Sequence, residues 1–110
     1  LALSDDFTSK PTEDEIRSEL RQIRYYHLHK KHLDITLTNG IPNRITQIIK
    51  KYNQMIETAP IMLYHLYVGL YIWGETQEAL AFDMDLTTDY ISKCHKKLIK
   101  FLLTKSKTAD

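Results

Sequence analysis

Apolar residues recur every three or four positions over much of this chain, a spacing that places them on one face of an α-helix. The first such group consists of Ile16, Leu20 and Ile23. Thr12 and Glu15 stand just before it in the arrangement of a capping box, in which two side chains bind backbone N–H groups at a helix start. The pattern therefore predicts a long first helix over Glu13–Leu33.

Two prolines frame a second helix and open a third. Pro42 suits the first turn of a helix, and the residue before Pro60 disfavours helical backbone, so the second helix lies between them. Its apolar stripe consists of Ile45, Ile48, Ile49, Tyr52 and Ile56. The third helix runs from Ile61 to about Trp73 and is ended by Gly74. It is apolar nearly all round, which is typical of a helix buried at the centre of a domain.

Two threonines predict the starts of the last two helices. Thr76 caps a short fourth helix, about Gln77 to Asp83, and Thr87 caps a fifth, about Thr88 to Leu103. Only a short stretch, around Met84–Leu86, separates them. No alternating run of useful length predicts a strand. We therefore expect an all-α fold of about five helices.

The last two helices fit a C-terminal helix-turn-helix, over about residues 76–103, preceded by the long N-terminal helix. Two helices joined so closely, the second longer and basic, are the signature of this motif. Ala81 is small at the position where the two helices must approach. The other inner positions hold Leu80, Met84, Leu86, Ile91 and Cys94. Asp85 stands where the turn usually carries glycine, and aspartate tolerates positive φ better than most residues.

The fifth helix has two chemically opposite sides. One side gathers Ile91, Cys94, Leu98, Phe101 and Leu102, and the opposite side gathers Lys93, Lys96, Lys97 and Lys100. In helix-turn-helix proteins, residues near the start of the second helix reach base edges. The residues at that position are Thr88, Asp89, Tyr90, Ser92 and Lys93. Lys96, Lys97 and Lys100 lie farther along, where we expect contact with backbone phosphates. An ordinary solvated helix surface is the alternative interpretation of the lysine side.

The segments Met62–Ile72, Thr76–Ala81 and Tyr90–Lys93 carry a family resemblance. The stretch from Tyr52 to Leu102 that contains them resembles the promoter-reading domain four of sigma factors. More narrowly, it is similar to phage and mobile-element regulators of the ArpU/RinA type from Gram-positive bacteria. The resemblance implies an activator of phage or island genes that binds double-stranded DNA with the helix Thr88–Lys100. It also implies RNA polymerase as a further candidate partner.

Composition and charge agree with this interpretation. The 110 residues suffice for one domain, which we place at 12–110, behind a flexible acidic leader at 1–11. The formal net charge of +1 hides an asymmetry, because residues 92–109 contain lysines and no acid. Such asymmetry can mark a nucleic-acid face. The single cysteine suits a reducing compartment, and the pattern shows neither a signal peptide nor a membrane span. We therefore expect a cytoplasmic protein that does not enter a membrane.

Other chemistry finds less support in the residue pattern. His27, His29 and His32 suggest a metal site, but only the last two share a helix face and Asp34 is the one nearby acid, so a polar helix face is favoured. Most of the seven tyrosines fall at core spacing, and Cys94 lies on an apolar side. No glycine-rich phosphate loop, activated nucleophile or acid–base pair is apparent. We therefore expect no enzymatic activity, no metal and no cofactor.

A second class of function stays open at this point. Helix-turn-helix folds also serve as protein-interaction modules, so the chain could be a helical adaptor or inhibitor that binds a host protein through its acidic beginning or first helix. As a DNA-binding protein it would be expected to form a homo-oligomer, because a lone small domain reads few base pairs. The stripe of Ile16, Leu20 and Ile23 belongs either to such a dimer interface or to the domain's own core.

Overall fold

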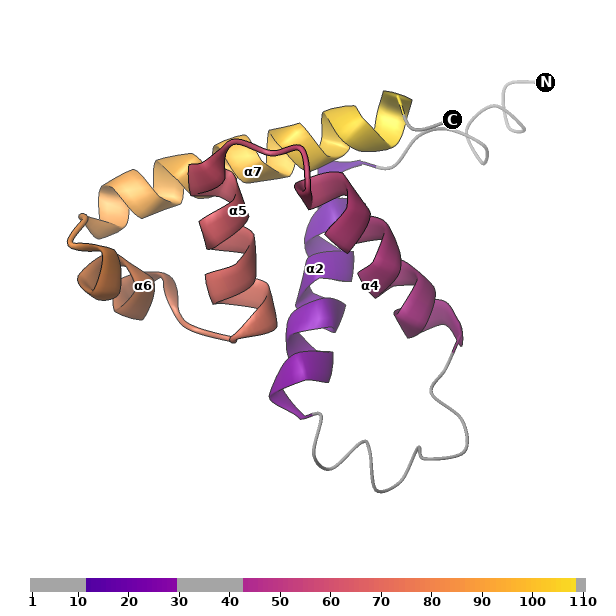
Figure 1. Ribbon diagram of the computed structural model, residues 1–110, viewed down its shortest axis with the longest axis horizontal. Coiled ribbons are helices and arrows are strands. Elements are labelled where there is room, and N and C mark those ends of the chain that lie inside the picture. Colours follow the sequence, from indigo (N-terminus) through magenta and orange to yellow (C-terminus); the bar gives the residue numbers. More distant parts are fainter. Residues whose placement is uncertain (1–11, 30–42, 109–110) are drawn as a thin grey trace.

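The computed structural model describes residues 12–29 and 43–108, and this part of the chain is all-helical, with no strand. Its elements are α2 (Glu13–Leu28), α4 (Asn43–Ile56), α5 (Ile61–Tyr67), the π-helix η1 (Val68–Ile72), α6 (Gln77–Met84) and α7 (Thr88–Thr108). Because η1 continues α5, the described residues form five helices, as predicted. Figure 1 shows α7 lying across one side of the molecule, with the other helices gathered on its other side.

The first predicted helix is present, and its start is the predicted capping box. The Thr12 hydroxyl accepts a hydrogen bond from the Glu15 N–H at 3.3 Å, and the Glu15 carboxylate accepts one from the Thr12 N–H at 2.8 Å. The helix ends at Leu28 and not at the predicted Leu33, with His29 as its C-cap. Residues 30–33 of the predicted range lie outside the described residues.

The apolar stripe of α2 belongs to the domain's own core. Ile16, Leu20 and Ile23 are each 0% exposed and pack among buried residues of the other helices. A dimer interface on this stripe is therefore wrong, because the side chains that would form it are already covered.

The third predicted helix is central, but it is not buried on every side. It starts at Ile61 and continues as η1 to Ile72, and Gly74, with φ of 75°, follows it as predicted. Leu63, Leu66 and Tyr67 are buried, and the helix contacts α2, α4, α6 and α7. One side remains open, because Ile61 and Trp73 are each 69% exposed. The apolar pattern predicted a central helix buried on several sides, which these contacts confirm, but it could not show which side receives no neighbour.

Polar contacts tie α2 to the elements beside it. The Arg24 guanidinium donates to the carbonyls of Leu70 at 3.1 Å and Gly74 at 2.7 Å, so it satisfies backbone oxygens at the end of η1. On α4, the Tyr52 hydroxyl donates to the Glu19 carboxylate at 2.6 Å. Burial and this hydrogen bond with Glu19 raise the pKa of Tyr52, so its hydroxyl remains a donor.

Candidate nucleic-acid interface

The turn between α6 and α7 is fixed by local backbone hydrogen bonds. Asp85 has φ of 59° and ψ of 44°, the left-handed conformation predicted for this position. The Leu86 N–H donates to the Ala81 carbonyl at 2.8 Å, and the Asp85 N–H donates to the Phe82 carbonyl at 3.2 Å. These two bonds form a Schellman motif, a common way to end a helix. The connection between the two helices is therefore a defined turn.

The inner side of the α6–α7 pair agrees with the sequence prediction. Leu80 and Ala81 are buried, and Met84 and Leu86 are partly buried against the same core. Beneath α6, a Cβ atom added to Gly69 would lie 2.8 Å from Leu80 Cδ1. The absence of a side chain at Gly69 therefore lets α6 pack closely on η1.

The start of α7 presents its side chains to solvent. The Thr87 hydroxyl accepts a hydrogen bond from the Tyr90 N–H at 3.1 Å, which is the predicted N-cap. Of the five residues predicted to reach base edges, Thr88, Asp89, Tyr90 and Lys93 are exposed and Ser92 is half-buried. A side-chain hydrogen bond with Cys94 raises the pKa of Tyr90, so its hydroxyl is protonated at neutral pH.

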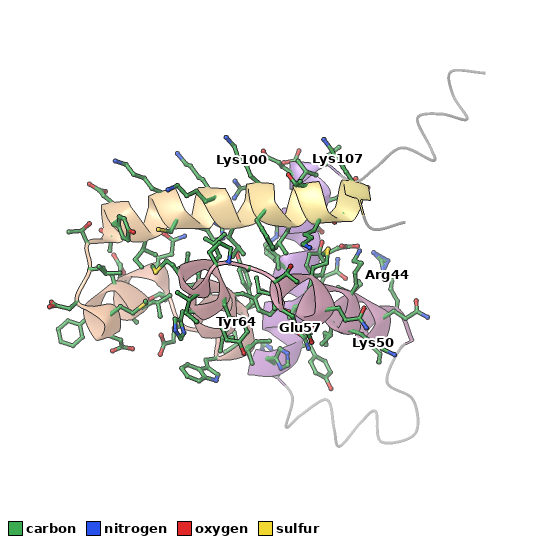
Figure 2. The ribbon with its side chains drawn as sticks, turned by 45° about the horizontal axis from the view of Figure 1, so that its top comes forward. Arg44, Lys50, Glu57, Tyr64, Lys100 and Lys107 are labelled. Carbon is green, nitrogen blue, oxygen red and sulfur yellow. The ribbon has the colours of Figure 1, made fainter. Side chains whose placement is uncertain are left out.

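The predicted lysine side of α7 is an exposed basic face. Lys93, Lys96, Lys97 and Lys100 are all exposed. Figure 2 shows Lys100 and Lys107 projecting from the same side of α7. Because α7 extends to Thr108 and not to the predicted Leu103, it also carries Lys107, which is exposed. The face from Lys93 to Lys107 spans about 21 Å at the helical rise per residue. Asp89 is the one acid on this helix.

The opposite side of α7 fixes how the basic face points. Ile91, Cys94, Leu98 and Leu102 are buried as predicted, and so is Ile99. These residues hold α7 against α2, α4, α5 and α6. With one side of the helix held in the core, the lysines can only lie outward. Cys94 is a buried free thiol in this packing, also as predicted.

A hydrogen bond that the sequence pattern did not reveal joins α7 to η1. The His95 ring nitrogen Nε2 lies 2.5 Å from the Tyr71 hydroxyl. Burial and the nearby Arg17 lower the pKa of His95, while burial raises the pKa of Tyr71 to about 12. The hydrogen bond therefore joins a neutral imidazole to a protonated tyrosine hydroxyl. Only the fold brings these two residues together, since they lie on separate helices.

The described residues assemble neither a metal site nor a membrane-spanning helix. Within residues 12–29 and 43–108, no group of three or more His, Cys, Asp or Glu is placed to hold a metal ion; His32 and Asp34 lie outside these ranges. None of the helices described is both long and apolar enough to cross a bilayer. The site that the structure assembles is thus an exposed, lysine-rich helix behind a short turn. Comparisons of this chain with models of protein families, with curated proteins and with solved structures found no match.

Proposed function

We propose that this protein is a sequence-specific double-stranded DNA-binding regulator of transcription, with α6 and α7 as its helix-turn-helix. The observation that carries the proposal is the pairing of a short, hydrogen-bonded turn with a long helix that is buried on one side and lysine-rich on the other. A helix with these properties suits the major groove, which admits one α-helix. The resemblance to ArpU/RinA-type regulators points to phage or mobile-element genes as the targets.

The proposed roles follow the order of residues along α7. Thr88, Asp89, Tyr90 and Lys93 are exposed on its first turns, where recognition helices contact base edges. Ser92 is half-buried, so we assign it a smaller share of this surface. The later lysines would neutralise phosphates and release counterions; they are Lys96, Lys97, Lys100 and Lys107.

Self-association and polymerase contact remain part of the proposal. Two-fold related half-sites would double the sequence that one small domain can read. The interface for such a dimer must lie elsewhere than the buried stripe of α2. The rival function is an adaptor that acts through the first helix, but the apolar stripe of that helix is buried and cannot contact a partner. The acidic beginning of the chain, the other surface considered for an adaptor, lies outside the described residues.

The test is fluorescence anisotropy with a duplex enriched from a random pool and with its scrambled counterpart, at two salt concentrations. Lys93→Ala combined with Lys96→Ala should weaken binding at least about tenfold. It should also reduce the slope of log affinity against log salt by about one, because each phosphate contact contributes about 0.9 and only Lys96 of this pair is assigned to a phosphate. The matched control is Arg44→Ala combined with Lys50→Ala. It removes the same charge from exposed positions on another helix, α4; Figure 2 shows Arg44 and Lys50 on a different side of the molecule from Lys100 and Lys107.

Two results would contradict the proposal. The first is equal binding of the enriched and scrambled duplexes, which would remove sequence specificity. The second is an equal loss of affinity in the α7 and α4 double variants, which would show that net charge, and not the α7 face, governs binding.

A further inference from the structure

The outer side of α5 and η1 carries apolar side chains that no other described element covers. Ile61 and Trp73 are each 69% exposed, Tyr64 is 41% exposed, and Val68 and Ile72 are half-buried. We call these five residues the α5–η1 face. Contiguous apolar surface of this kind is uncommon on proteins that act alone and often marks an interaction site.

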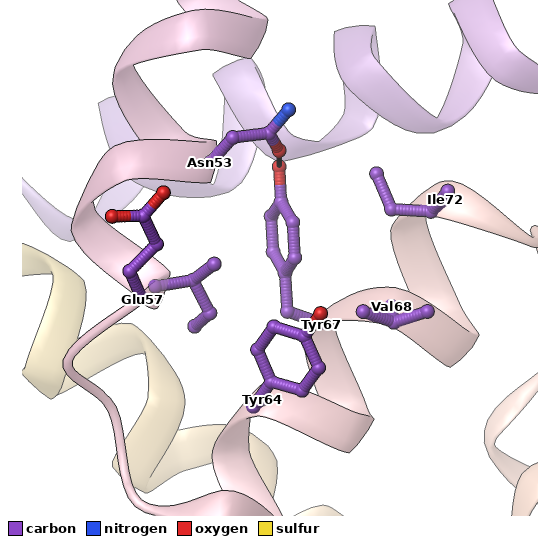
Figure 3. A pocket seen from close by; sticks show the side chains of 7 residues that line it. Asn53, Glu57, Tyr64, Tyr67, Val68 and Ile72 are labelled. Carbon is purple, nitrogen blue, oxygen red and sulfur yellow. Dashed lines mark hydrogen bonds between the residues drawn. The ribbon is translucent and has the colours of Figure 1, made fainter.

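A first hollow flanks this face on the side of α4. It has a volume of about 400 Å³, and Tyr64, Tyr67, Val68 and Ile72 line it together with Asn53, Ile56 and Glu57. Figure 3 shows the Tyr67 ring standing in the middle, with its hydroxyl donating to Asn53 Oδ1 at 2.8 Å. Because Tyr67 is almost fully buried and hydrogen-bonded, the floor of the hollow is held in place.

A second hollow flanks the face on the side of α6. It has a volume of about 310 Å³, and it is lined by His65, Val68, Gly69, Trp73, Glu75, Leu80, Asp83 and Met84. Val68 lines both hollows, so they lie on either side of the same helix. Partly apolar hollows of this kind can receive the apolar side chains of an amphipathic helix, which binds by inserting its apolar face into a groove.

Three carboxylates lie at the two hollows. Glu57 lines the first, and Glu75 and Asp83 line the second, whereas none of the lining residues is lysine or arginine. Partial burial and the adjacent Asp83 carboxylate raise the pKa of Glu75, as expected where two acids crowd together. A cation brought to this edge would relieve that repulsion.

A second copy of this chain does not fit the face well. A two-fold interface pairs a surface with itself, so it would bring six carboxylates, two copies each of Glu57, Glu75 and Asp83, into one interface, and the residues that line the two hollows supply no lysine or arginine to pair with them. Like charges facing each other across an interface are costly. The acidic rim therefore selects a partner with the opposite charge.

We propose that the α5–η1 face binds a helical segment of a partner protein that inserts large apolar side chains and carries lysine or arginine beside them. This binding uses α4, α5, η1 and α6, and it does not depend on the proposed contact of α7 with DNA. The two activities can therefore be tested separately on the full chain.

Trp73 is the only tryptophan of the chain and lies on this face, so its fluorescence reports binding there. The probes are two tryptophan-free amphipathic helical peptides with the same leucine stripe, one flanked by lysines and the other by glutamates. The lysine peptide should shift Trp73 emission to the blue and bind at least about tenfold more tightly than the glutamate peptide.

Variants separate apolar from electrostatic recognition. Tyr64→Ala should weaken the lysine peptide about tenfold, because a large aromatic contact is lost. Glu57→Lys combined with Asp83→Lys, both at exposed positions, should reverse the preference toward the glutamate peptide. Circular dichroism confirms that each variant is folded, and Lys93→Ala combined with Lys96→Ala should bind the lysine peptide as the unaltered chain does.

Three outcomes would overturn the proposal. One is no change in Trp73 emission with either peptide. Another is equal affinity for the two peptides that survives the charge reversal. The third is concentration-dependent self-association in ultracentrifugation that Tyr64→Ala abolishes, which would assign the face to a second copy of the chain.

Discussion

The basic face of α7 and the α5–η1 face are two open surfaces of one helical core, and they carry opposite chemistry. The first consists of exposed lysines on long, flexible stems. The second is apolar, hollowed on two sides and rimmed by Glu57, Glu75 and Asp83. Charges act over about 10 Å at moderate salt, whereas apolar surfaces act only on contact. The basic face is thus suited to attracting an extended anion, and the α5–η1 face is suited to holding a fitted side chain.

The two faces share their support. The buried side of α7 packs on α5, and the other side of α5 is the one left open. A change inside this contact should affect both faces, whereas a change on either surface should affect one.

The largest effect is expected for Leu98→Ala. Leu98 is 0% exposed on the inner side of α7, and deletion of such a side chain costs about 2–5 kcal/mol of unfolding free energy. Urea denaturation measures this loss, and DNA and peptide binding should decline together as the folded fraction falls. The matched control is the adjacent, exposed Lys97→Ala, which should change stability by about 0.5 kcal/mol or less. Loss of only one binding activity in folded Leu98→Ala would contradict a shared support.

The features that could be predicted from the sequence are those with local causes. The caps at Thr12, Thr76 and Thr87 and the left-handed Asp85 depend on residues within one helical turn. The division of α7 into a buried side and a lysine side could also be predicted, because its apolar residues recur with the period of an α-helix. The end of α7 was set too early at Leu103, although residues 104–108 contain no glycine or proline to stop a helix.

The features that could not be predicted depend on neighbours far along the chain. Arg24 binds carbonyl oxygens 46 and 50 residues away, and Tyr71 meets His95 across 24 residues. Whether the stripe of α2 was core or interface depended on the same long-range packing. The open side of α5 and η1 was missed for that reason, since an apolar helix shows no sign in its own sequence of which neighbours it lacks.

A smaller effect is expected from the protonation of His95, which joins the helices that bear the two faces. Its pKa is lowered by burial and by Arg17, so the unfolded chain takes up protons more readily than the folded one. Stability should therefore be full above the ordinary histidine pKa of 6.5 and should fall as the pH drops below it. Urea denaturation from about pH 8 to about pH 5 should show a steeper loss for the unaltered chain than for His95→Gln, which cannot titrate.

The other histidines titrate in both proteins, so the difference between the two curves isolates His95. Parallel curves would show that its protonation is not linked to folding. Because His95 lies on α7 and contacts Tyr71 of η1, a positive charge on its buried ring at low pH should loosen both faces together, unlike any surface substitution.

The smallest effect on stability is expected for substitutions in the turn before α7. They also distinguish most sharply between the basic face of α7 and the α5–η1 face. Left-handed backbone costs an ordinary residue about 1–2 kcal/mol, and aspartate offsets part of this by local hydrogen bonding. Asp85→Ala should therefore lower the unfolding free energy by about 1 kcal/mol. Asp85→Gly should change it by only about a few tenths of a kcal/mol, because glycine adopts this conformation without strain but has more conformational entropy to lose on folding.

Both substitutions remove the same exposed carboxylate, so electrostatics alone would strengthen DNA binding equally in the two variants. If the turn sets the angle at which α7 meets DNA, the alanine variant should bind more weakly than the glycine variant, and peptide binding at the α5–η1 face should be the same in both. Identical DNA affinities would mean that the geometry of the turn does not contribute to recognition and that the basic face acts through its charge alone.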